Sequence, residues 1–444
     1  NPRDPADIQV ANINAAKSII VLSPESGESD AYVVKTLLAI VNHPQRKKGK
    51  YNIIAEISDQ SNREITEIAG KDEVTVVVSN DIIAKITVQT TRQTGLSILY
   101  NDIIDFGNVE IYILPVKGAE GYTYKDLVLG LRKEYVIGIR KANGKLMLNP
   151  AGGTIFEKDD NVIVIAEDDT DIIFNPSNIK NNISLPAKQE RISMDLKQVQ
   201  RTLILGWNLK TPLFIKELEN YVLPGSEVLV VCHLEYARKK IEEIKGEIKN
   251  QTISFHEGFI NDRKVLLSLP LEKFDDVVIS SYSDVYGIQE ADAITIISLM
   301  HLRDIALKQN LKFNMVTEMM DEKNQIVAEA YKVDDFIVSH QVISKIMTQL
   351  SENKELSAIF EELFDAEGCE FYLKPAVDYI KPGMPTDLYT LSQIALSRNE
   401  TCIGYKKTKL CNSPADNYGI YLAPDKSQSI ILDPEDKIIV VSEN

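Results

Sequence analysis

The stretch NIIAEISDQSN at residues 52–62 recurs as NMVTEMMDEKN at residues 314–324, with Asn, Glu, Asp and Asn at the same places. The match extends on both sides of this stretch. Further pairs are ESDAYVVKTLLAI (28–40) with EADAITIISLMHL (290–302), SNDIIAKITVQ (79–89) with SHQVISKIMTQ (339–349), and ILYNDIIDFGNVEIYILP (98–115) with AIFEELFDAEGCEFYLKP (358–375). The chain therefore contains two copies of one domain type.

Each copy has the pattern of an α/β fold. The apolar runs SIIVL (18–22), YNIIAEI (51–57) and VTVVV (74–78) have the length of buried strands, and helical patterns separate them. This alternation predicts Rossmann-like βαβ units, a mostly parallel sheet and helices on both faces. Short strands with turns at Asn143-Gly144 and Gly152-Gly153 follow the first copy and predict a small separate α+β C-terminal subdomain, with a counterpart after the second copy.

We predict the following boundaries: a first lobe at 1–115, its small subdomain at 116–170, a linker at 171–198, a second lobe at 199–375, and its small subdomain at 376–444. The linker is rich in Asn, Pro and Ser and lacks periodicity. The first strand, helix and second strand of the second copy, within 201–232, have no counterpart in the first. We therefore expect residues upstream of Asn1 to complete the first lobe in a longer natural protein.

Composition limits the class of function. The 444 residues carry a formal net charge of −16 with 44% apolar and 26% charged residues, which argues against nucleic acid or an anionic membrane surface as a partner. The four cysteines form no C-x-x-C pair, so neither a zinc site nor a disulfide framework is indicated. No apolar stretch is long enough to predict a membrane span.

Carboxylates follow the strand ends of both copies. Asp30, Glu56 and Asp59 lie at such positions in the first copy; their counterparts in the second are Asp292, Glu318 and Asp321. Ligands of doubly wound sheets bind at the carboxyl ends of strands, and oxygen ligands suit a hard cation, Ca²⁺ first and Mg²⁺ second. The alternative is that the aspartates cap helix N-termini, and the sequence leaves both interpretations open.

The first βα turn of the second copy, LILGWNLKTPLF (203–214), lacks the G-x-G-x-x-G pattern of a dinucleotide site. Gly206 stands alone, and Trp207, Asn208 and Lys210 obstruct the path to a pyrophosphate. We expect no nucleotide in this domain. No catalytic motif is present either, so the sequence predicts no enzymatic activity.

Five segments together resemble the CASTOR and POLLUX ion channels, whose cytosolic part consists of tandem RCK domains. They are NPRDPADIQVANINAAKSIIVL (1–22), EISD (56–59), NDIIDFGNVEIYI (101–113), ILGW (204–207) and ELFDAEGCEFYL (362–373). The resemblance covers most of the chain in the same order and is weakest over 376–430.

The resemblance implies the cytosolic portion of a membrane protein that conducts potassium or a related cation. Its partners would be an N-terminal transmembrane pore domain of the same protein and three further copies in a homotetrameric gating ring. The regulatory ligand it implies is Ca²⁺, with the six acidic strand-end residues as candidate ligands. Two alternatives are a TrkA-like nucleotide-binding subunit of a potassium transporter and a dinucleotide-dependent oxidoreductase.

Overall fold

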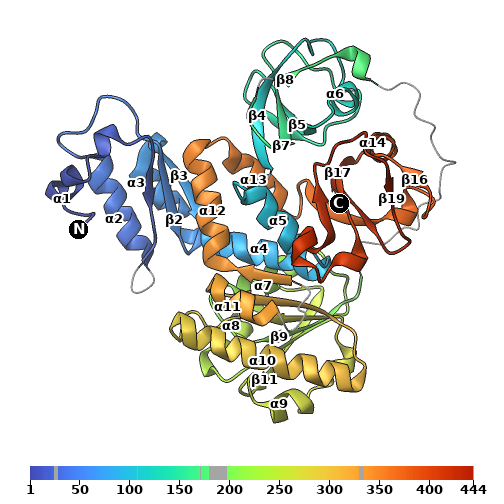
Figure 1. Cartoon of the computed structure of the whole chain (residues 1–444). Helices are drawn as coiled ribbons and strands as arrows, with labels where there is room; N and C mark the ends of the chain where they lie inside the picture. The colour runs from blue at the N-terminus through green and yellow to red at the C-terminus, as the bar shows by residue number, and fades with distance from the viewer. Residues whose placement is uncertain (25–28, 108, 171, 180–197, 330–334, 444) are drawn as a thin grey trace.

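Two α/β lobes and two small β subdomains make up the chain (Figure 1). The computed structural model describes residues 1–24, 29–107, 109–170, 172–179, 198–329 and 335–443. None of the helices in these ranges combines the length and the hydropathy that a bilayer crossing requires.

The second lobe contains a six-stranded parallel sheet in the order β11-β10-β9-β12-β13-β14. Strands β9, β12, β13 and β14 bury nearly all of their residues, as expected for a sheet that helices cover, whereas the edge strand β11 is largely polar. In chain order its elements are β9 (Arg201–Leu205), α7 (Thr211–Leu218), β10 (Ser226–Cys232), α8 (Glu235–Ile244), β11 (Gln251–Glu257), α9 (Arg263–Ser268), β12 (Asp276–Ile279), α10 (Ile288–Gln309), β13 (Asn314–Met319), α11 (Glu322–Glu329) and β14 (Asp335–Val338).

The first lobe repeats the last half of that pattern. Its parallel sheet has the order β1-β2-β3, which corresponds to β12-β13-β14. Its elements are α1 (Pro5–Val10), β1 (Ile19–Val21), α2 (Ser29–Val41), β2 (Ile53–Ile57), α3 (Arg63–Gly70) and β3 (Val74–Val78). The predicted α/β class with two Rossmann-like lobes is confirmed.

The two copies exchange helices. Directly after β3, helix α4 (Ser79–Arg92) leaves the first lobe and packs on α7, β12 and β13 of the second. After β14, helix α12 (Ser339–Glu352) packs on β1 and β2 of the first lobe in return. Figure 1 shows α4 between α12 and α7. Each lobe therefore completes its core with a helix from the other.

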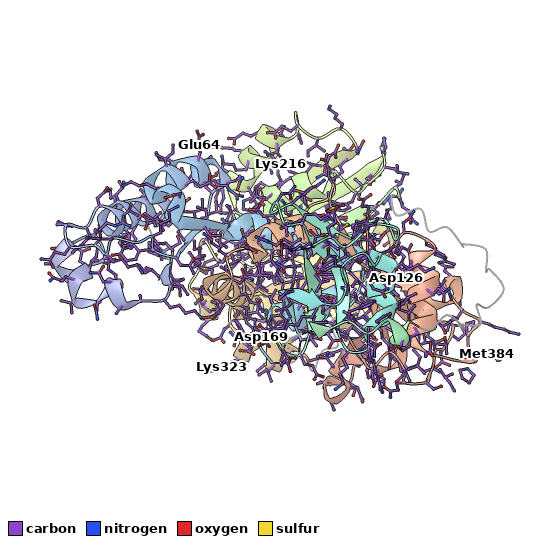
Figure 2. The ribbon with its side chains drawn as sticks, turned by 90° about the horizontal axis from the view of Figure 1, so that it is seen from above. Glu64, Asp126, Asp169, Lys216, Lys323 and Met384 are labelled. Atoms are coloured by element: carbon purple, nitrogen blue, oxygen red, sulfur yellow. The ribbon has the colours of Figure 1, made fainter. Side chains whose placement is uncertain are left out.

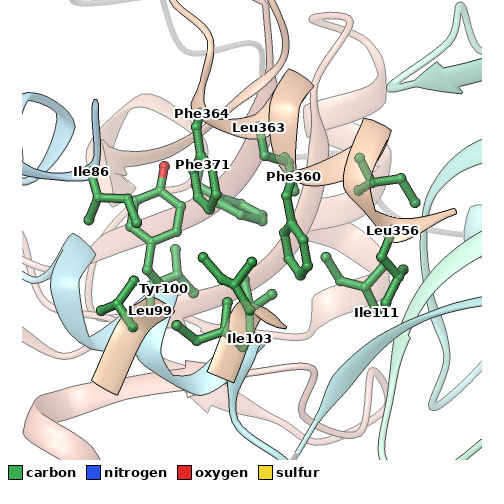
Figure 3. Packing of buried hydrophobic residues seen from close by; sticks show 14 of the residues in the cluster. Ile86, Leu99, Tyr100, Ile103, Ile111, Leu356, Phe360, Leu363, Phe364 and Phe371 are labelled. Atoms are coloured by element: carbon green, nitrogen blue, oxygen red, sulfur yellow. The ribbon is translucent and has the colours of Figure 1, made fainter. Parts of the chain in front are cut away.

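Each exchanged helix is followed by a second one: α5 (Leu96–Ile104) follows α4, and α13 (Leu356–Phe364) follows α12. These two helices form the core between the copies. Figure 3 shows Tyr100 of α5 facing Phe364 and Phe371. The ring centroids lie 5.4 and 5.7 Å from that of Tyr100, both edge to face, a favoured aromatic geometry. Because this cluster contains side chains from both lobes and both small sheets, the copies share one core.

The small subdomains also repeat each other. The first has the sheet order β6-β5-β7-β4-β8 and the second β15-β20-β17-β18. The elements are β4 (Glu110–Lys117), α6 (Tyr124–Gly130), β5 (Tyr135–Arg140), β6 (Leu146–Leu148), β7 (Asn161–Ala166) and β8 (Ile172–Ile173), then β15 (Glu370–Pro375), β16 (Pro385–Thr386), α14 (Leu388–Leu396), β17 (Thr401–Lys406), β18 (Ile420–Leu422), β19 (Ile430–Ile431) and β20 (Lys437–Ser442).

The small sheets begin earlier than the expected boundaries. Strand β4 starts before residue 116 and β15 before residue 376, and each pairs with the last long strand of its own small sheet. Strand β8 lies within the range 171–198 and pairs with β4. Most of the expected linker lies outside the described residues.

A β-bulge occurs at Gly138 in β5 and again at Gly404 in β17. A Cβ atom at Gly138 would lie 2.5 Å from the carbonyl oxygen of Met147, and one at Gly404 would lie 2.2 Å from that of Tyr421. Close backbone approach therefore requires glycine at both positions, and an Ile-Gly pair occurs at each, Ile137-Gly138 and Ile403-Gly404.

A buried lysine joins the two small subdomains. Lys426 donates hydrogen bonds to the carbonyl oxygens of Val128 and Leu131, each at 2.8 Å, at the C-terminal end of α6. A lysine at this end of a helix satisfies carbonyl groups that lack a partner within the helix.

Seen from above, the first lobe around Glu64 and the second small subdomain around Met384 lie at opposite ends of the molecule (Figure 2).

Candidate ligand site at the strand ends

Asp30 and Asp292 hold the same loop in the two copies. Asp30 accepts hydrogen bonds from the backbone N–H groups of Ser58 and Asp59 at 2.9 and 3.0 Å, and from the Asn62 amide at 2.9 Å. Asp292 accepts from Met320 N, Asp321 N and the Asn324 amide at 3.0, 3.0 and 2.8 Å. Both side chains are buried. This identical geometry explains why the Asp and Asn positions recur.

Asp59 and Asp321 receive backbone hydrogen bonds from the turn that follows. Asp59 accepts from Ser61 N at 2.9 Å, and Asp321 accepts from Lys323 N at 2.9 Å. Asp321 also accepts from the Gln289 amide at 3.2 Å. These contacts are the ones expected if the aspartates cap the segment that follows, which is the alternative to a cation site that the sequence left open.

Glu318 is paired with a lysine. Lys210 Nζ lies 2.9 Å from Glu318 Oε1, and both side chains are nearly buried, at 11% and 7% exposed. The remaining acceptor capacity is filled by Ser339 Oγ at 2.7 Å and by the Asn208 amide at 2.7 Å. A buried carboxylate requires this kind of compensation, so the second copy neutralises its own strand end.

Glu56 occupies the corresponding place in the first copy without such a partner. It accepts from the backbone N–H of Ser23 at 3.3 Å, and none of the described lysines or arginines forms an ion pair with it. Burial raises the pKa of Glu56, against opposing contributions from the hydrogen bonds of Ser23 and Ser79 and from the nearby His340. The two copies thus differ in what surrounds this strand-end glutamate.

The turn that would bind a nucleotide in the second copy is filled by its own side chains. Gly206 has a φ of +99°, and a Cβ there would lie 2.1 Å from the carbonyl oxygen of Ser280. Trp207 is buried, and Asn208 Oδ1 accepts from the N–H groups of Lys210 and Thr211 at 3.0 and 3.2 Å. The first N–H groups of α7 are therefore not available to a phosphate.

Asp30 lies beside the loop that contains Asp59, and Asp292 lies beside the loop that contains Asp321. The carboxylate oxygens of all four aspartates accept hydrogen bonds from N–H groups. Within the ranges described above, no three His, Cys, Asp or Glu side chains are arranged as metal ligands. The six-residue cation site therefore stays a prediction. Sequence reasoning noted Lys210 as an obstruction and missed its role as the partner of Glu318, since only the fold brings the two together.

Comparison with known proteins finds similarity to ion channels. Residues 80–182 match the family model described as Castor and Pollux, part of voltage-gated ion channel. The chain is 26% identical over 438 residues to the ion channel CASTOR of Lotus japonicus, which covers 90% of this chain and 51% of that protein. It is 26% identical over 479 residues to the probable ion channel POLLUX of Oryza sativa subsp. japonica, covering 98% and 48%.

The fold also has a solved counterpart. The human SLO3 gating ring aligns with a TM-score of 0.71 at 13% identity, over 100% of this chain and 90% of that one. The resemblance predicted from the sequence motifs is confirmed, and the expectation of a non-enzymatic chain agrees with these relatives. The chain spans about half the length of the curated relatives it matches.

Proposed function

We propose that this chain, a relative of the CASTOR and POLLUX ion channels, is the cytosolic gating-ring region of a cation channel. The observation that carries this proposal is the alignment of the entire chain with a gating ring. The exchanged helices support it, because packing α4 and α12 each on the opposite lobe lets a change in one lobe reach the other through packed elements.

We assign ligand sensing to the first copy. In the second copy the ammonium group of Lys210 supplies the positive charge beside Glu318, whereas among the described residues Glu56 has no lysine in an ion pair, only His340 near it, and its pKa is raised by burial. A bound cation would supply the missing charge. Ca²⁺ suits this position because it takes carboxylate and carbonyl oxygens in flexible geometry, and Asp59 and Asp30 are the additional donors that this proposal assigns. The filled turn at Gly206 supports the absence of a nucleotide from the second domain.

The assembly we propose is a homotetrameric ring attached to an N-terminal transmembrane pore of the same protein. Ligand binding would favour one arrangement of the lobes by its difference in affinity between the two. Coupling of this kind is typically about 1–3 kcal/mol per site, and several sites in one ring produce a steep response.

Calorimetric titration of the chain with Ca²⁺ tests the sensing proposal. We expect binding by the unmodified chain, loss of binding in the double variant Glu56→Gln with Asp59→Asn, and retention of binding in the matched second-copy variant Asp321→Asn. Absence of heat and of thermal stabilisation at millimolar Ca²⁺ would contradict the cation site. Binding of NAD in the same assay would favour the transporter-subunit alternative.

The ring is tested separately by the mass of the chain in solution. Light scattering after size-exclusion chromatography, with and without Ca²⁺, is expected to give a tetramer at high protein concentration. A monomer at every concentration in both conditions would contradict assembly through this region alone, and would leave the calcium result unaffected.

A further inference from the structure

Two cavities lie where the exchanged helices meet the sheets. The larger, of about 380 Å³, is lined by residues of α4, α5, α11, β14, α12 and the loop 411–418. The smaller, of about 260 Å³, is lined by the segment after β2 together with α3, β3, α4, α12 and α13. We refer to them as the larger and the smaller cavity.

The duplication relates these cavities to each other. By the sequence match of the two copies, Gln325 in the larger cavity corresponds to Arg63 in the smaller, Asn101 to Glu361, and Tyr100 to Phe360. Val342 corresponds likewise to Ile82. The two are therefore copies of one cavity that carry different side chains, and each serves as an internal control for the other.

The smaller cavity neutralises its own carboxylates. Arg63 lies 2.5 Å from Glu361, and Lys85 lies 3.3 Å from Asp81 and 3.5 Å from Asp365. These five residues all line the cavity, so its charges are paired and a ligand would have to break an existing ion pair.

The larger cavity has acidic lining residues, and no lysine or arginine is among the described residues that line it. Lys345, the counterpart of Lys85, bonds to Asp105 at 2.9 Å and to Asn101 Oδ1 at 2.7 Å. Of the acidic lining residues, Asp335 is already used, because it accepts from the N–H groups of Gly95 and Ser97 at the start of α5.

The other two acidic lining residues are Glu322, which is exposed at the start of α11, and the half-buried Asp102, which we take as the acidic group available to a ligand within the cavity. The Asp102 side chain accepts from the Asn417 amide at 2.6 Å, and burial raises the pKa of Asp102 to about 6, so it is largely ionised at neutral pH. Asn417 and its neighbour Tyr418 have φ values of 48° and 52°. Two successive non-glycine residues in the left-handed region are strained, and strain of this kind concentrates at ligand sites.

Apart from Glu322, the remaining described walls are apolar or uncharged. Phe336, Ile337 and Val342 contribute an apolar surface, and Gln341 and Asn412 contribute side-chain amides. A ligand that fits this lining carries one positive charge on an apolar body, because its charge pairs with a carboxylate and an aromatic ring also attracts a cation. The absence of lysine and arginine from the described lining disfavours phosphates and carboxylates.

We propose that the larger cavity binds a small organic cation, with the ammonium group at Asp102 and the apolar body against Phe336 and Ile337. The walls come from both copies, so the site exists only while they are docked on each other. Its occupant therefore stabilises that arrangement. Binding does not depend on the calcium site or on the channel role, so the two proposals fail separately.

Titrations of the full chain at neutral pH with three probes test this inference. The probes share a phenyl group and differ in charge: phenethylamine is cationic, 2-phenylethanol is neutral and 3-phenylpropionate is anionic. Ligand-observed NMR is expected to give saturable binding of the amine, at least about 10-fold weaker binding of the alcohol, and none of the carboxylate. Equal binding of amine and carboxylate, or no amine binding at roughly 10 mM, would overturn the proposal.

Two variants locate the site. Asp102→Asn removes the carboxylate, and Gln325→Arg introduces the cation that the smaller cavity holds at the equivalent position; each is expected to weaken amine binding at least about 10-fold. Asp81→Asn, in the lining of the smaller cavity, is expected to leave amine binding unchanged. Because Gln325 is half-buried on α11, its variant keeps the test valid if Asp102→Asn does not fold. Wild-type affinity in either folded variant would contradict the assignment.

Discussion

Glu56 and Glu318 stand at the same strand end of two copies of one domain, and they have different surroundings. Glu318 is held by Lys210, Asn208 and Ser339, whereas Glu56 accepts from the backbone of Ser23 and has a raised pKa because it is buried. The neighbouring aspartates have kept identical contacts in both copies. Duplication has therefore preserved the residues that shape the loop, while the partners of the strand-end glutamate have diverged.

The largest expected effect comes from breaking the neutralised pair in the second copy. Lys210→Met leaves Glu318 buried beside an apolar side chain, and we expect a loss of about 3–5 kcal/mol in the free energy of unfolding. Chemical denaturation monitored by circular dichroism measures it. The double variant Lys210→Met with Glu318→Gln is expected to recover most of the loss, and failure to recover would show that Lys210 acts through other contacts.

An intermediate effect is expected at the conserved loop anchors. Asp30→Asn and Asp292→Asn each replace an acceptor of two backbone N–H groups by a neutral amide, and we expect each to cost about 1–3 kcal/mol in unfolding free energy, measured without divalent ions. Equal losses in the two variants would show that the two aspartates hold their loops equally strongly in the two copies. If Asp30→Asn instead stabilises the ion-free chain, the hydrogen bonds to Asp30 do not compensate its buried negative charge. That result would support Asp30 as a cation ligand.

The smallest effect is expected at Glu56 and depends on pH. Since the pKa of Glu56 is higher in the folded than in the unfolded chain, its ionisation costs no stability below the unfolded pKa. The cost appears as pH rises towards the folded pKa and is complete above it. Glu56→Gln is therefore expected to stabilise the chain at neutral pH by less than about 1 kcal/mol, and to have no effect in acid. Denaturation at both pH values, repeated with Ca²⁺, would show whether the cation reverses the difference.

Local patterns predicted the duplication and the α/β class, because buried parallel strands such as IIAEI and VTVVV are short apolar runs with helices between them. The helix exchange was not predictable in the same way. The pattern of SNDIIAKITVQ identifies an amphipathic helix and its apolar face, but nothing local distinguishes the sheet of its own lobe from that of the other copy. That choice depends on contacts between residues far apart in the sequence.

The site shows the same limit. The Asp and Asn positions around the repeated loop were visible as a repeat, and their geometry follows from it. The pairing of Lys210 with Glu318 joins residues more than a hundred positions apart, and no spacing rule relates them. The larger cavity was invisible for the same reason, since its walls come from three separate parts of the chain.

The exchange of α4 and α12 has a consequence for how the chain is made. During translation the apolar faces of α4 and α5 are synthesised long before their partners in β13, β14 and α13. The first lobe likewise lacks its packing partner α12 until most of the second lobe has been synthesised. Nascent chains that expose such surfaces are prone to aggregation. A ribosome that stops within the second lobe thus releases a product with two unfinished halves, which makes this region a substrate for chaperones until α13 and β15 have been synthesised.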